Sequence, residues 1–100
     1  MSYLRVNMVN HDSIEKRDEA LNRLNTKGGE IFPEIQIFIA IATGETSNMT
    51  ISIYEDEAAA NRAITTRDEM MKKRGTELEV AFEGDIKAFY QKQIVTAEPT

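Results

Sequence analysis

Hydrophobic and polar residues alternate along four short stretches of the chain, and two longer stretches with helical spacing lie between them. Period-2 alternation places every second side chain on one face, and it predicts strands over residues 3–9, 35–43, 49–54 and 77–83. Apolar stripes at helical spacing predict one helix that ends at Gly28-Gly29. Its N-cap candidates are the consecutive residues Asn10-His11-Asp12-Ser13, and Asp12 with Glu15 resembles a capping box. Such stripes predict a second helix between Asp56 and Gly75, and a short final helix over 85–94.

This order of elements, β-α-β-β-α-β, predicts an α+β fold of the ferredoxin-like type. Right-handed crossovers in two split β-α-β units give a four-stranded antiparallel sheet in the order 4-1-3-2, with two helices on one face. We expect a single domain over residues 1–95 and a flexible tail over 96–100.

The second strand is apolar on both of its faces. Isoleucines alternate with Phe38 and Ala40, so both sides of this strand must be covered, whereas two helices can cover only one side. We expect the isoleucines, with Leu4, Val6 and Met8, to meet the helices. The opposite, mixed face, which carries Arg5, Asn7 and Tyr54 among others, would then meet the sheet of a second copy.

Two short sequence segments support the expectation of a second copy. Tyr54-Glu55-Asp56-Glu57-Ala58-Ala59 leads from a strand into an acidic, alanine-rich helix, and Glu83-Gly84-Asp85-Ile86 closes the last strand. With the element order, they make residues 3 to about 90 resemble the dimeric α+β barrel (dimeric ferredoxin-like) superfamily. The chain is similar to uncharacterised environmental members, and more distantly to antibiotic-biosynthesis-type monooxygenases. It implies a homodimer with sheets packed face to face and a small organic ligand held between sheet and helices.

Composition narrows the possible partners. A net charge of −5 opposes binding to nucleic acid or to anionic lipid, because both rely on Lys and Arg contacts with phosphate. The chain has no cysteine, which excludes disulfides and thiolate metal sites. No stretch reads as a signal peptide or a membrane helix, so we expect a cytoplasmic protein.

Candidate catalytic residues are His11 and Glu79. His11 is the single histidine, and it could act as a base, although a solvated or helix-capping role is the interpretation we favour. Arg5 lies between Glu79 and Glu83 if the first and last strands are neighbours. This cluster could orient a polar ligand or shift a carboxylate pKa, or it could be a cross-strand ion pair that stabilises the sheet.

The expected ligand-binding residues point from the strands to the mixed face of the sheet, and they are Arg5, Asn7, Phe38, Ser52, Tyr54 and Glu83. By contrast, Met70 and Met71 are interpreted as core residues and Arg67 as a surface residue. No nucleotide-binding motif or histidine pair is present, so we expect neither a metal nor a cofactor.

Two functions remain open. The first is a homodimeric small-molecule-binding protein, either a cofactor-independent monooxygenase or an isomerase acting on a small hydrophobic, oxygenated compound. The second is a non-catalytic module for dimerisation and protein interaction. The sequence does not decide whether the protein is an enzyme.

Overall fold

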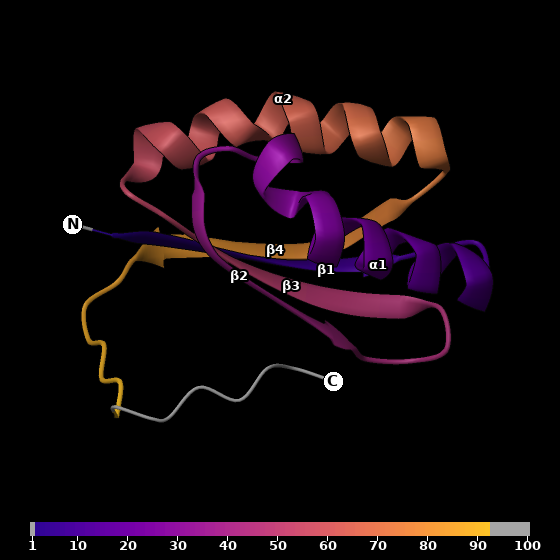
Figure 1. The fold of residues 1–100 in the computed structure, drawn as a ribbon, viewed down its shortest axis with the longest axis horizontal. Helices are drawn as coiled ribbons and strands as arrows, with labels where there is room; N and C mark the ends of the chain where they lie inside the picture. The colour runs from indigo at the N-terminus through magenta and orange to yellow at the C-terminus, as the bar shows by residue number, and fades with distance from the viewer. Residues whose placement is uncertain (1, 93–100) are drawn as a thin grey trace.

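The computed structural model describes residues 2–92, and it confirms the predicted order of elements. The elements are β1 (Tyr3–Asn10), α1 (Ile14–Ile31), β2 (Ile35–Ala42), β3 (Ser47–Tyr54), α2 (Glu57–Arg74) and β4 (Glu77–Asp85). The strands form one antiparallel sheet in the order β2-β3-β1-β4, which is the predicted ferredoxin-like order. Figure 1 shows both helices on one side of this sheet.

Helix α1 is longer than predicted. Its N-cap is Ser13, whose hydroxyl accepts a hydrogen bond from the Lys16 N–H, so the capping box predicted at Asp12 is wrong. The helix also continues through Gly28-Gly29, where it was expected to end, and stops at Phe32. Pro33 explains this stop, because a proline disfavours helical dihedrals in the residue before it.

Helix α2 has the predicted boundaries. The Asp56 carboxylate accepts a hydrogen bond from the Ala59 N–H, which satisfies a free donor in the first turn. Gly75 ends the helix in the left-handed conformation, with φ of 67°. Three basic residues precede it in the last turn, where their positive charges interact favourably with the negative end of the helix dipole.

The predicted final helix is wrong over the residues that the structure describes. Strand β4 continues to Asp85, and the Ile86 N–H donates a hydrogen bond to the Ser2 carbonyl, so this segment stays beside β1. Residues 86–92 have no helical structure. Residues 93–95 of the expected domain, and the expected tail over 96–100, lie outside the described residues.

The two faces of the sheet are the reverse of those predicted. Tyr3, Arg5, Asn7 and Val9 of β1 are buried beneath the helices, while the residues between them are partly exposed. The antiparallel register places Asn48, Thr50, Ser52 and Tyr54 of β3 on the same buried side. The helices therefore cover the polar face, and within residues 2–92 no helix covers the strongly apolar face.

A bulge in β2 sets which of its side chains face the helices. Ile35 pairs with Tyr54, whereas Ile37 pairs with Ile53, so Gln36 is an extra residue in the ladder. After it, Phe38 lies opposite Ser52 on the helix side. A second irregularity between Met8 and Val9 leaves Glu79 without a partner in the register of β1 and β4.

Among the described residues, the face away from the helices carries large apolar side chains on both edge strands, β2 and β4. Those with the greatest exposure lie between 38% and 64% exposed, and they are Ile37, Ile39, Ile41, Val80 and Phe82. Exposed apolar surfaces of this kind occur at protein and membrane interfaces and at ligand-binding grooves. Within residues 2–92, neither helix combines the length and the apolar character that crossing a membrane requires.

Two glycine substitutions test the helix ends. Gly29→Ala should stabilise the protein by up to about 1 kcal/mol, because it replaces glycine inside an exposed helix. Gly75→Ala should destabilise it by about 1 kcal/mol, because alanine disfavours positive φ and its Cβ would lie 3.0 Å from an Asp12 carboxylate oxygen. Urea denaturation measures both. A destabilised Gly29→Ala would mean that α1 ends at the glycines, as the sequence pattern suggested.

Candidate ligand pocket between the sheet and the helices

A pocket of about 100 Å³ lies between the helix-facing side of the sheet and the two helices. Its sheet side is polar, with Asn7, Asn48, Thr50 and Ser52 each at most 8% exposed. Side chains at such positions normally form the apolar core of a two-layer domain. Burying polar groups there costs free energy unless they have partners, so this face is not built only for packing.

The opposite side of the pocket combines apolar side chains with three arginines of the helices, Arg23, Arg67 and Arg74. Leu24 of α1 and Met70 and Met71 of α2 line it, together with Phe32 and with Phe38 of β2. The sequence analysis interpreted the two methionines as core residues. In the structure they line the pocket. Apolar side chains combined with a few polar groups are typical of sites that bind small organic molecules.

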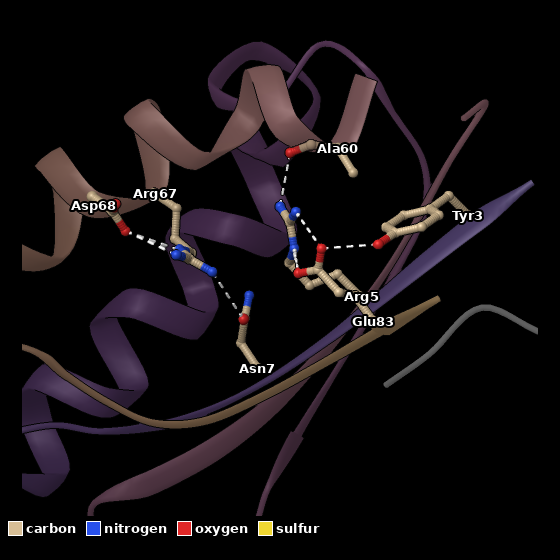
Figure 2. A network of polar contacts seen from close by, with 7 residues as sticks. All are labelled: Tyr3, Arg5, Asn7, Ala60, Arg67, Asp68 and Glu83. Carbon is tan, nitrogen blue, oxygen red and sulfur yellow. Dashed lines mark hydrogen bonds and ion pairs between the residues drawn. The ribbon is translucent and has the colours of Figure 1, made fainter. Parts of the chain in front are cut away.

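Arg5, which lines the pocket, forms the centre of a polar network (Figure 2). Its side chain is 1% exposed, and its Nε lies 2.9 Å from Oε2 of Glu83 on the neighbouring strand β4. Its Nη1 donates to the Ala60 carbonyl of α2 at 2.8 Å, and the Tyr3 hydroxyl donates to Glu83 at 2.9 Å. Arg5 thus joins β1, β4 and α2.

These contacts shift two pKa values in opposite directions. Hydrogen bonds from Arg5 are the main reason that the pKa of Glu83 lies below its usual value. Burial, with a smaller contribution from the adjacent Glu83 carboxylate, raises the pKa of Tyr3 to about 12. At neutral pH the network therefore consists of a guanidinium, a carboxylate and a neutral phenol.

Arg67 extends from α2 to the sheet across the pocket (Figure 2). Its Nη1 donates to Asn7 Oδ1 at 3.3 Å, and its Nε donates to Asp68 at 3.0 Å. The sequence pattern suggested a surface role for Arg67, which is wrong because the side chain is only 18% exposed and lines the pocket.

His11 lies at another part of the pocket wall and is buried. Its Nε2 is 2.5 Å from Oδ1 of Asn48, and its backbone N–H donates to the Thr46 carbonyl. The solvated or capping role favoured from sequence is therefore wrong, since His11 is 8% exposed and Ser13 caps the helix. An amide oxygen only accepts, so this contact places a proton on Nε2.

The structure brings together most of the residues that the sequence analysis selected. The pocket lining includes five of the six expected ligand-binding residues and His11; the five are Arg5, Asn7, Phe38, Ser52 and Tyr54. Glu83 lies behind them as the partner of Arg5. Glu79 is exposed at the bulge and does not pair with Arg5, so the predicted cluster with two carboxylates is wrong.

Several lining residues were not selected from sequence. Asn48 and Thr50 could have been found, because they alternate with Ser52 on the same face of β3. Arg23 and Arg74 come from different helices, and no local pattern indicates that both reach one pocket. Between residues 2 and 92, no group of three or more metal-ligating side chains lies together.

No protein-family model and no curated protein sequence matches this chain. Solved structures do resemble it. The structural-genomics protein YJCS is 18% identical, with a TM-score of 0.66 over 87% of this chain and 100% of that one. A dimeric ferredoxin-like protein from an uncultured marine organism is 11% identical, with a TM-score of 0.66 over 90% and 99%. SnoaB, a cofactor-independent oxygenase from Streptomyces nogalater, is 16% identical, with a TM-score of 0.59 over 90% and 95%.

These comparisons confirm the fold that the sequence indicated. The similar structures include dimeric ferredoxin-like proteins and antibiotic biosynthesis monooxygenase-type proteins, as expected. A shared fold at such low identity carries no specific activity, because one fold hosts many functions.

Removing the charge of Glu83 should destabilise the protein. Glu83→Gln leaves the buried Arg5 guanidinium without its carboxylate, and we expect a loss of about 2 kcal/mol, less than for a fully buried pair because the Glu83 side chain is 35% exposed. Glu79→Gln, on the same strand but exposed, is the matched control and should change stability by less than about 0.5 kcal/mol.

The ion pair of Arg5 and Glu83 also predicts how the stability of the protein changes at acidic pH. The pKa of Glu83 is lower in the folded protein than its usual 4.5, so the ionised carboxylate stabilises the fold above that value. This contribution disappears as the pH falls through the folded pKa. Wild-type protein should therefore lose more stability between pH 6 and pH 3 than Glu83→Gln does, as measured by urea denaturation at each pH. Equal losses would contradict this assignment.

Proposed function

We propose that this protein is a homodimer that binds a small hydrophobic, oxygenated compound in the pocket between sheet and helices. The observation that carries this proposal is the polar, helix-facing side of the sheet. Asn7, Asn48, Thr50 and Ser52 supply hydrogen-bonding groups where a core would normally be apolar, and they line one pocket with apolar side chains of the helices such as Leu24, Met70 and Met71.

The uncovered face of the sheet supports the homodimer. Its isoleucines and Phe82 would be covered if a second copy packed its own sheet against them. Similar structures include a protein described as dimeric. The proposed interface therefore uses the apolar face, whereas the sequence analysis assigned the mixed face to the partner.

His11 is the candidate base of the pocket. Because Asn48 accepts from Nε2, the neutral ring carries its lone pair on Nδ1, where it can take a proton from a bound compound. Returning that proton to a different carbon would be an isomerisation. In a monooxygenation, dioxygen would oxidise a CH₂ group to a carbonyl, with one oxygen atom retained and the other released as water. Both reactions proceed without a cofactor.

Native mass spectrometry of protein purified from cells tests the binding function. We expect a dimer carrying one small organic molecule per subunit. Ala63→Met should lose this added mass while staying dimeric, because Ala63 lines the pocket and a longer side chain would fill it. Ala58→Met, exposed on the same helix, is the control. A dimer that binds no small compound in either form would favour the non-catalytic module.

A charge on the uncovered face tests the dimer separately. Ile39→Lys should weaken dimerisation by about 100-fold, because a lysine in the middle of β2, on the apolar face, would be buried without a partner in the interface. Asn61→Lys adds the same charge on exposed α2 and should leave the dimer intact. Sedimentation equilibrium measures both. Unchanged association of Ile39→Lys would show that the copies meet elsewhere.

A further inference from the structure

The charge of the pocket is opposite to the charge of the protein. The chain has a net charge of −5 and contains 17 acidic residues. Among the described residues that line the pocket, however, there is no Asp or Glu, and there are four arginines, which are Arg5, Arg23, Arg67 and Arg74.

Two of the four arginines are neutralised by close carboxylates. Arg5 pairs with Glu83 at 2.9 Å, and Arg67 pairs with Asp68 at 3.0 Å. Arg23 has a looser contact, 3.7 Å from Glu19, and Arg74 has no carboxylate partner within residues 2–92. The uncompensated positive charge of the pocket is therefore concentrated at Arg23 and Arg74.

Arg23 and Arg74 come from the two helices and lie where the pocket meets a second, outer hollow of about 380 Å³. Both line the pocket and the hollow, as does His11. The outer hollow adds two further cations, Lys16 and Lys73, against the carboxylates of Asp12 and Glu19. A concave surface with an excess of one charge attracts ions of the opposite sign.

The two guanidinium groups also repel each other. Burial and the nearby Arg74 charge lower the pKa of Arg23. Arginine nevertheless stays charged in proteins, so its charge is destabilised at this position. An anion bound between the two groups would remove this penalty. Arginine is well suited to such binding, because its planar guanidinium can donate two parallel hydrogen bonds to a carboxylate.

We propose that the ligand of this pocket is an organic carboxylate, with its carboxylate on Arg23 and Arg74 and its apolar body against Leu24, Phe32 and Met70. This inference rests on the proposed binding function and specifies its ligand class. The pocket volume of about 100 Å³ limits the apolar body to at most about one ring, since a dry protein cavity of about 150 Å³ holds benzene. The carboxylate would also lie beside His11, the candidate base.

Helix stabilisation is the competing explanation for Arg74. A cation in the last turn of α2 favourably opposes the helix dipole, and Lys72 and Lys73 already occupy that turn. The dipole does not explain Arg23, which lies in the middle of α1. If Arg74 only stabilised the helix, its replacement would lower the stability of the protein. It would not change the relative affinities of the pocket for a carboxylate and for the corresponding amide.

Matched acid and amide probes test the inference directly. We would titrate the wild-type full chain with benzoate and with benzamide, and follow the backbone amide NMR signals of pocket residues. The two compounds have the same shape, and they differ in charge. Benzoate should bind at least about tenfold more tightly, because hydrogen bonds to a charged group are the stronger ones. Inorganic phosphate should bind more weakly than benzoate, since it has no apolar body.

Variants locate the anion contact. Arg23→Gln and Arg74→Gln should each remove most of the preference for benzoate while leaving benzamide affinity unchanged. Arg62→Gln, on exposed α2 and outside the pocket lining, removes the same charge and should keep the full preference. Arg74→Lys keeps the charge at the end of α2, so it should keep wild-type stability but lose part of the preference. Thermal denaturation confirms that each variant is folded.

Each other result has a distinct meaning. If benzamide binds the pocket as tightly as benzoate, the carboxylate inference is overturned and the proposed binding function stands. A preference for benzoate that survives in both glutamine variants overturns the assignment to Arg23 and Arg74. Phosphate binding as tight as benzoate binding overturns the organic ligand class. If neither ring compound shifts any pocket signal at millimolar concentration, the inference and the proposed binding function both fail.

Discussion

A buried guanidinium group must find carboxylate and carbonyl partners within the fold, and Arg5 meets this constraint with groups from two other elements. Glu83 on β4 neutralises it, and the Ala60 carbonyl on α2 accepts from it. Small side chains at Ala59, Ala60 and Ala63 allow α2 to lie close enough for that contact. The position of the helix over the sheet, and hence the space left beside Arg5 for the pocket, therefore depends on this one side chain.

The element order and the strand positions followed from the sequence, because alternation and capping are local properties. The face covered by the helices did not. Hydrophobicity indicates that a side chain is buried, but not what buries it, and in this protein the uncovered side of the sheet is more apolar than the pocket side. Leu4, Val6 and Met8 therefore seemed to belong under the helices, where Arg5 and Asn7 lie instead.

The site was predictable to the extent that it lies on strands. Arg5 and Asn7 share one face through the period of two, and Ser52 and Tyr54 lie on the neighbouring strand, so the sequence could group them. His11 is in a loop, and its contact with Asn48 joins residues 37 positions apart, which no local pattern encodes. The same limit applies to Arg23 and Arg74, whose approach depends on how two helices pack.

The bulge at Gln36 determines which side chains of β2 face the pocket and which face away from the helices. A change in the length of the strand would therefore affect both surfaces at once. Upstream of it, Ile35 points to the helices; downstream, the isoleucines point away and Phe38 points to the pocket. If Gln36 paired in the ladder, or if a residue further along β2 were deleted, the later side chains would change faces, turning isoleucines into the pocket and Phe38 outward. Insertions and deletions in β2 should therefore be far less tolerated during evolution than substitutions, even though the strand lies at the edge of the sheet.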